Sequence, residues 1–278
     1  MSAGTGAVKL ISDGTFLLDG GAVFGQVPKV QWELHSKPDR RNRIRLGLNC
    51  LLIQAGGHNI LVDTGAGSKR LDKFKDSLGL NGNKLLKGLK DHGLGARDID
   101  IVVLTHLHFD HSGGCTKLDR SGEVLPTFPK AKHLIQKSCW DEAAKPNERA
   151  KPAFDPDDFM PLQERGLVTL LDGDTQVAPG VKVKMTGGHC SGHQVVLVEH
   201  GSERIAFAGD LIPTPHHLPL PCISAYDQTP NATMDSKREL LEMATKGGWL
   251  VVFGHAAEQR AGYVEYRNGR VQVQPVEM

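Results

Sequence analysis

The chain has 278 residues, of which 39% are hydrophobic and 23% are charged. These proportions are typical of a soluble globular protein and exclude a disordered or fibrous one. The formal net charge is only +1, which gives no support to binding of nucleic acids or anionic membranes. Histidine, however, occurs 13 times, and its imidazole is the commonest metal ligand in proteins.

Targeting signals and disulfides are not indicated. No run approaches the roughly 18 apolar residues of a membrane-spanning helix, and the first residues lack the cationic start and apolar core of a signal peptide. The five cysteines are odd in number and form no C-x-x-C pair, which favours reduced thiols. We therefore expect a cytoplasmic protein.

The first half of the chain is rich in short strands. Apolar runs at 46–54 and 59–62 predict two strands, and the glycine-containing segment 55–58 between them predicts a hairpin. Leucines at helical spacing predict a helix over 83–92. The apolar run 101–105 is typical of a strand that is buried on both faces.

The second half alternates strands with helical segments. A helix is expected at 235–246, and strands at 131–136, 167–171, 181–185, 194–199, 204–208 and 250–253. No internal repeat or long linker interrupts the pattern. The sequence therefore predicts a sheet-rich α/β layered protein, with residues 1–278 forming one domain.

A dense group of metal-ligating residue types directly follows the strand predicted at 101–105. Its sequence is HLHFDH, in which His106 and His108 face one side of an extended segment. If the chain then turns into a helix, Asp110 and His111 point at a neighbouring spot. A catalytic zinc takes about three protein ligands, so four in six residues favour two metals over one. The alternative reading is a histidine-rich surface loop.

Three further candidate ligands stand at the ends of other predicted strands, each beside glycine. They are His189, Asp210 and His255. Glycine at such a position lets the backbone turn sharply at a crowded centre. Loops at strand ends are where functional sites are usually built.

Taken in order, the segments LVDTGAG (61–67), HLHFDHSGG, GGHCSGHQ, FAGD and FGH resemble the metallo-β-lactamase superfamily over about residues 46–256. The resemblance implies a single-domain, four-layer αββα sandwich with two divalent metal ions at one edge of the paired sheets. Zinc is the first choice, and manganese, iron, cobalt or nickel also suit such ligands.

The resemblance also assigns roles to individual residues. It implies that His106, His108 and His189 hold the first metal, that Asp110, His111 and His255 hold the second, and that Asp210 bridges them. Asp63 and His193 are implied as supporting residues around the ligands. Asp110 and Asp210 are the expected catalytic residues, with Asp110 passing a proton to the leaving group.

Two metals of this kind hold a bridging hydroxide near neutral pH, which predicts hydrolysis without a covalent enzyme intermediate. Segments 18–25, 209–214 and 224–227 resemble N-acyl homoserine lactone lactonases, which quench quorum sensing, and also methyl-parathion-type organophosphate hydrolases. We expect opening of a lactone ring, although Pro213 stands where well-known lactonases place a tyrosine. Hydrolysis of organophosphates or aryl esters, or a non-catalytic metal-binding role, is the alternative.

The remaining expectations concern partners. Substrate contacts are expected from Phe24, Trp32, Phe109, His216, His217 and Tyr226, with ordinary core packing as the alternative for the apolar ones. The basic run 37–45 is interpreted as a solvated loop beside the site. We expect a small-molecule substrate, neither a nucleic acid nor a membrane as partner, and a chain compatible with a homodimer.

Overall fold

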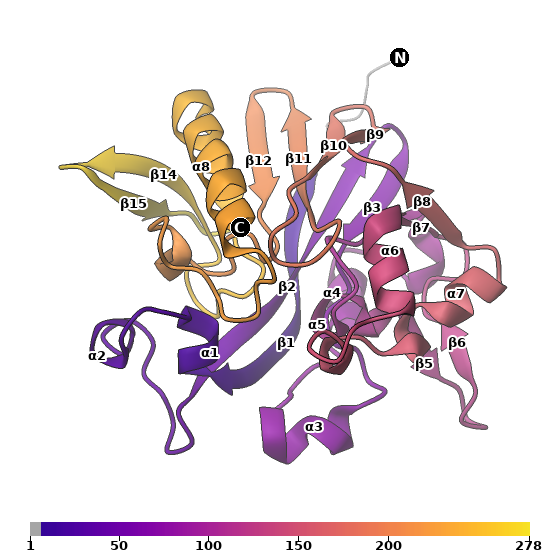
Figure 1. Ribbon diagram of the computed structural model, residues 1–278. Helices are drawn as coiled ribbons and strands as arrows, with labels where there is room; N and C mark the ends of the chain where they lie inside the picture. The colour runs from indigo at the N-terminus through magenta and orange to yellow at the C-terminus, as the bar shows by residue number, and fades with distance from the viewer. Residues whose placement is uncertain (1–6) are drawn as a thin grey trace.

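The structure is a computed structural model that describes residues 7–278, and two large β-sheets form its centre (Figure 1). The six-stranded sheet has the order β1-β2-β3-β4-β7-β8, formed by Val8–Asp19, Arg43–Ala55, His58–Val62, Ile101–Val103, Lys132–Gln136 and Val168–Leu171. The seven-stranded sheet has the order β15-β14-β13-β12-β11-β10-β9, formed by Arg270–Pro275, Ala261–Arg267, Leu250–Val252, Glu203–Phe207, Gln194–His200, Val181–Met185 and Thr175–Ala178.

Shorter elements surround these sheets. A small hairpin pairs β5 (Thr116–Leu118) with β6 (Val124–Pro126). The α-helices α1 to α8 span Gly20–Phe24, Lys29–Trp32, Leu71–Leu78, Leu85–Asp91, Phe109–Ser112, Lys137–Ala144, Met160–Glu164 and Pro230–Gly247. Within residues 7–278, five 3₁₀ turns lie at Ala96–Asp98, Gly113–Cys115, Lys151–Ala153, Pro156–Asp158 and Pro215–His217. None of the helices described here is long and apolar enough to cross a membrane.

The strands alternate their side chains between two separate cores. In β2, Leu51 and Ile53 join the core between the sheets, whereas Cys50 and Leu52 pack beneath helices on the outer face. In the other sheet Val196 faces inward and Leu197 outward. Because side chains on a strand alternate with a period of two, a continuous apolar run is buried on both faces.

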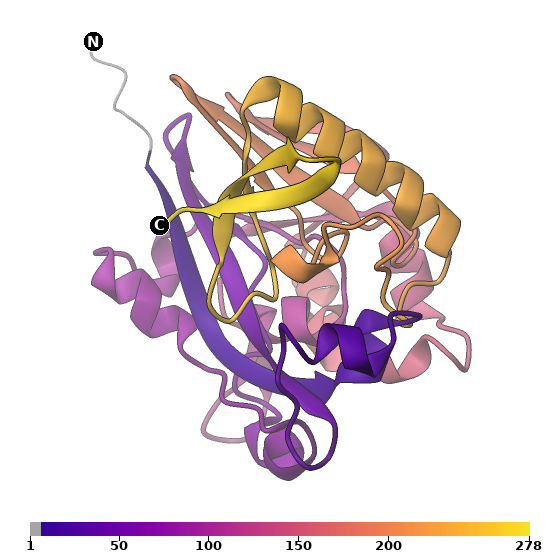
Figure 2. The same ribbon diagram turned by 90° about the vertical axis from the view of Figure 1, so that its left-hand side faces the viewer.

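Helices close both outer faces, as Figure 2 shows for α8 along the seven-stranded sheet. Leu240 and Leu241 of α8 pack onto that sheet, while Leu89 of α4 and Leu162 of α7 belong to the core on the six-stranded sheet. The layers are therefore helix, sheet, sheet, helix. This confirms the predicted αββα architecture.

The predicted elements differ from the structure mainly at their ends. The strand expected to reach residue 105 ends at Val103, because the backbone N–H of Thr105 donates to the side chain of Asp63 instead of to a neighbouring strand. Helix α8 starts five residues earlier than expected, with Pro230 in its first turn, where proline is tolerated. Several elements were not predicted at all: strands β1, β5, β6, β9, β14 and β15, and helices α1, α2, α3, α6 and α7.

Candidate metal centre

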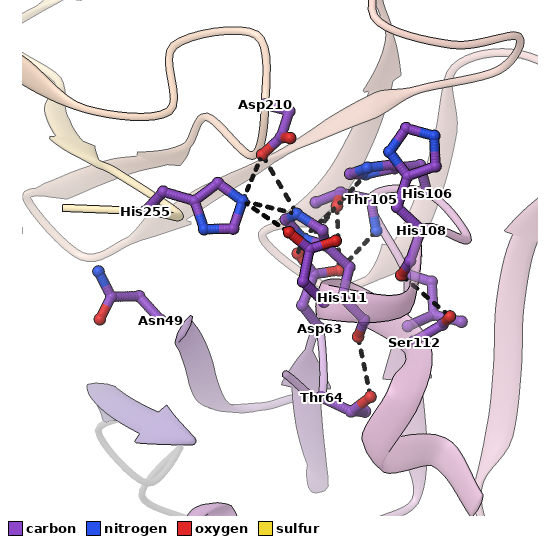
Figure 3. Close-up of polar contacts among 12 residues, drawn as sticks. Asn49, Asp63, Thr64, Thr105, His106, His108, His111, Ser112, Asp210 and His255 are labelled. Carbon is purple, nitrogen blue, oxygen red and sulfur yellow. Dashed lines mark hydrogen bonds and ion pairs between the residues drawn. The ribbon is translucent and has the colours of Figure 1, made fainter. Parts of the chain in front are cut away.

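All seven residues predicted as ligands converge at one edge of the two sheets. Figure 3 labels five of them: His106, His108, His111, Asp210 and His255. They form two groups in which the ligand atoms lie within 4.8 Å of one another: His106, His108, His189 and Asp210 in one, and Asp110, His111 and His255 in the other. His106 and His108 follow β4, and Asp110 and His111 belong to α5. Asp210 follows β12 and His255 follows β13.

Sheet topology explains why these distant segments meet. Strands β3 and β4 are parallel, as are β12 and β13, so their carboxyl ends lie at a common edge. Asp210 leaves its strand through Gly209, which has φ +50 and lies so close to His193 that an added Cβ would be 2.8 Å from its Nε2. Only glycine meets both requirements without strain.

Asp210 lies between the two groups with one carboxylate oxygen toward each. Its Oδ2 is 3.2 Å from the Nε2 of His189, in the first group. Its Oδ1 is 3.2 Å from the Nε2 of His111 and 3.0 Å from that of His255, in the second group. This placement is what a carboxylate shared by two cations requires.

Hydrogen bonds fix the orientation of three of these imidazole rings. The Nδ1 of His111 lies 2.8 Å from Asp63 Oδ2, and the Nδ1 of His255 lies 2.8 Å from the carbonyl of Gly47. The Nδ1 of His189 lies 2.7 Å from Asp227 Oδ1. Because each partner is an acceptor, a proton resides on each Nδ1, and Nε2 is the nitrogen that faces the centre.

These Nε2 atoms fit a bound cation. Those of His111 and His255 lie 3.0 Å apart, so a proton or a metal ion must lie between them. The buried Nε2 of His106 has no hydrogen-bond partner among the described residues, and Asp210 Oδ1 has only the Nε2 atoms of His111 and His255 beside it. Buried polar atoms are nearly always paired, so their convergence points to divalent ions held by imidazole and carboxylate.

Burial and charge shape the ionisation of the centre. Burial keeps the pKa of His106 well below its usual value, with a further contribution from the charge of His111, so its ring is neutral. Burial disfavours the charged form of Asp210, but the charges of His255, His111 and His189 hold its pKa well below the usual range. A neutral ring and an ionised carboxylate are the forms that bind metals.

The predicted supporting residues lie behind the ligands. Asp63 accepts hydrogen bonds from the backbone N–H and hydroxyl of Thr105 as well as contacting His111. His193 accepts a 3.0 Å hydrogen bond at Nε2 from the backbone N–H of Asp210. His193 thereby fixes the backbone of Asp210, whose carboxylate lies between the two groups.

Sequence reasoning missed two residues that support the ligands. Asp227, 2% exposed, orients His189 from 38 positions away, and no local pattern signals that pairing. Asn49 on β2 donates to the carbonyls of Phe253 and Ala256, which flank His255. A buried asparagine within an apolar strand run was the available signal for the second.

Three of the predicted substrate contacts form a buried column instead of a cavity wall. Trp32 stacks on Phe24 with centroids 5.5 Å apart, and Phe24 stacks on His217 at 4.8 Å. Both ring nitrogens of His217 are engaged, by the Thr214 hydroxyl and the Val23 carbonyl. The structure gives these three residues a packing role, and their contact with substrate stays a prediction.

The other three predicted contacts are more accessible. Phe109 lines a cavity of about 410 Å³ together with Phe74, Phe154, Pro152 and five charged residues, Arg70, Lys73, Glu148, Lys151 and Asp155. The Phe154 ring lies 4.9 Å from that of His108. Tyr226 is 44% exposed, and burial together with the charges of Asp110 and Asp19 raises its pKa. His216 stacks on His35 with centroids 5.0 Å apart, in the loop after Asp210.

Comparison with known proteins agrees with this geometry. The metallo-beta-lactamase superfamily profile matches residues 44–255. An N-acyl homoserine lactonase of Bacillus cereus is 27% identical over 80% of this chain and 86% of its own length. The structure of a probable metal-dependent hydrolase from Staphylococcus aureus aligns over the whole of both chains, with 28% identity and a TM-score of 0.87.

A third relative shows the fold with a ligand in place. AidC, a dizinc quorum-quenching lactonase solved with the product N-hexanoyl-L-homoserine, has a TM-score of 0.79 over 100% of this chain and 97% of its own, at 21% identity. The fold, the His and Asp clusters and the profile match define a metal-dependent hydrolase. The chain belongs to the metallo-β-lactamase superfamily.

Proposed function

We propose that this protein is a two-metal hydrolase that opens the ring of a lactone of the N-acyl homoserine type. The observation that carries the proposal is Asp210, whose two oxygens face two separate groups of histidine and carboxylate ligands. The similarity to N-acyl homoserine lactonases supports the choice of a cyclic ester as substrate.

Two divalent ions, zinc first, would supply Lewis acidity and a nucleophilic hydroxide near neutral pH. The first group, which includes Asp210, would hold one ion, and the second group together with Asp210 would hold the other. Asp63, Asp227 and the Gly47 carbonyl would keep the ring nitrogens aimed at the ions.

The protein's own groups account for the remaining steps. Asp110, whose side chain is 11% exposed and lies 3.5 Å from His255, would carry a proton to the leaving oxygen of the opened ring. The cavity lined by Phe74, Phe109 and Phe154 would bury the acyl chain. The half-exposed Tyr226 hydroxyl would donate to the ester carbonyl and so take the role of the tyrosine that Pro213 replaces.

A substrate panel tests the proposal. The protein, loaded in turn with zinc, manganese, cobalt, iron or nickel, is assayed for release of acid from N-hexanoyl homoserine lactone and from simple γ-lactones, and for cleavage of an aryl phosphotriester. We expect lactone turnover to exceed phosphotriester turnover by orders of magnitude. Good phosphotriester turnover with no lactone turnover would favour the organophosphate hydrolase, and no turnover by a fully loaded protein would favour the non-catalytic role.

A further inference from the structure

Two apolar side chains project into solvent from the short helix α2 and the turn after it. Val30 is 70% exposed and Leu34 is 75% exposed, more than any other large hydrophobic side chain in residues 7–278. Their spacing of four residues places them on one side of the helical turn, opposite the buried Trp32. An isolated exposed leucine needs no explanation, but a pair at helical spacing forms a small apolar patch.

Positive charge surrounds this patch. Residues 29–45 hold six Lys or Arg residues and two carboxylates, a formal net charge of +4 within a chain whose total is +1. One of the carboxylates, Asp39, already pairs with Arg43 at 2.7 Å. Lys29, Lys37, Arg40 and Arg41 are exposed. We call residues 29–41 the α2 flap.

The α2 flap is attached firmly beside the metal centre. Figure 1 shows α2 at the outer edge of the molecule, beyond α1. Trp32 anchors it by stacking on Phe24, which stacks in turn on His217 of the loop that follows Asp210. A surface that docked onto the flap would therefore lie close to the loops around the candidate active site.

We propose that the α2 flap docks onto an anionic lipid bilayer, with Val30 and Leu34 entering the boundary between headgroups and acyl chains. Lys29, Lys37, Arg40 and Arg41 would face the lipid phosphates. Shallow insertion of a few apolar side chains, combined with flanking cations, is how interfacial segments bind such surfaces. The expectation of no membrane partner used the charge of the whole chain, which hides this local excess.

Two other occupants fit the flap less well. In a two-fold dimer through this face, the flap of one copy, with a formal net charge of +2 over residues 29–41, would oppose the flap of the other, and like charges repel. A stable protein partner usually covers about 800 Å² on each side, far more than two side chains offer. A bilayer needs neither a shaped groove nor a large area.

Vesicle sedimentation tests the proposal without any substrate. Metal-loaded protein is mixed at low salt with vesicles of phosphatidylcholine alone or with phosphatidylglycerol added. We expect sedimentation with the anionic vesicles only, and loss of it at high salt. Each Lys or Arg near such a surface contributes about fivefold to partitioning, so Lys37→Glu with Arg40→Glu should weaken binding at least about 25-fold.

The apolar pair is tested separately, with matched controls. Val30→Ser with Leu34→Ser should weaken binding several-fold, whereas Leu118→Ser with Met160→Ser, which changes other exposed apolar side chains, should not. Lys87→Glu with Lys90→Glu is the control for charge. Thermal unfolding of each variant verifies that these surface substitutions leave the fold intact.

Three results would overturn the proposal. The first is that the wild type does not bind anionic vesicles. The second is that the control pairs weaken binding as much as the flap variants do. The third is that binding survives loss of both Val30 and Leu34, and that the protein binds soluble polyglutamate as tightly as it binds the vesicles. The last result would point to an acidic protein partner. None of them depends on lactone hydrolysis, so the two proposals fail independently.

Discussion

Asp227 forms a hydrogen bond with the ring of His189, in which Oδ1 of Asp227 lies 2.7 Å from Nδ1 of His189. The loop that carries Asp227 is itself held in place, because Arg149 donates to the carbonyls of Ala225 and Asp227 at 2.8 and 3.3 Å. The backbone N–H of Gln228 donates to the carbonyl of Gly188, which adds a further tie to the loop of His189. The carboxylate therefore fixes both the tautomer and the direction of this ring.

Replacing Asp227 should weaken metal binding without unfolding the protein. Loss of a partner of this kind typically lowers metal affinity by about 10- to 100-fold, so we expect this range for Asp227→Ala and a smaller loss for Asp227→Asn. Titration of the apoprotein with zinc against a competing chelator measures it. Asp235→Ala, at an exposed carboxylate of α8, is the control. Equal zinc affinity in Asp227→Ala and the wild type would show that Asp227 does not support the ligand.

The cavity that Phe109 and Phe154 line should set the preferred acyl chain. Phe154 lines it next to His108, so Phe154→Trp fills space that a long chain would occupy. We expect the ratio of kcat/KM for decanoyl over butanoyl homoserine lactone to fall about tenfold. Metal content, measured alongside, should stay unchanged. An unaltered ratio would place the acyl chain elsewhere.

The burial of His133 predicts an effect of pH on stability that does not depend on metal binding. Its ring is fully buried in β7, neither ring nitrogen has a hydrogen-bond partner among the described residues, and burial lowers its pKa to about 4. The unfolded chain, with a pKa near 6.5, takes up this proton first as the pH falls. Stability is therefore complete above about pH 6.5 and is lost progressively toward pH 4.

Substituting this histidine isolates its contribution. His133→Leu should remove about 2 kcal/mol of the destabilisation that the wild type suffers on going from pH 8 to pH 5. Urea unfolding of both proteins at the two pH values, with chelator present throughout, gives the change in the free energy of unfolding with pH for each protein. The difference between these two changes is the contribution of His133. A pH dependence that is identical in the two proteins would contradict a buried, unpaired imidazole.

Metal should also stabilise the fold. The Nε2 atoms of His111 and His255, 3.0 Å apart, repel each other unless a proton or a metal ion lies between them. A ligand that binds only the folded state adds about 4 kcal/mol at a thousand times its dissociation constant. Thermal unfolding with zinc should thus occur well above unfolding with chelator, and coincident transitions would speak against this site.

The sequence indicated the seven ligands because they follow apolar strands in tight motifs, and strand ends of one sheet edge meet in space. The architecture was also predictable, since strands such as β2 carry apolar residues on both faces. The long-range pairings could not be predicted. The hydrogen bonds of Asp227 with His189, and of Asn49 with the turn around His255, form only once the two sheets have packed. The packing of Phe24 and Trp32 likewise arises from tertiary contacts with His217.

Metal stoichiometry tests the central claim most directly. After loading with zinc and exhaustive dialysis, elemental analysis of the wild-type protein should give about two ions per chain. Asp210→Ala, which removes the carboxylate between the two groups, should retain one or fewer and lose lactone turnover with them. A single ion in the wild-type protein, or two ions retained by Asp210→Ala, would contradict a centre in which Asp210 joins two metals.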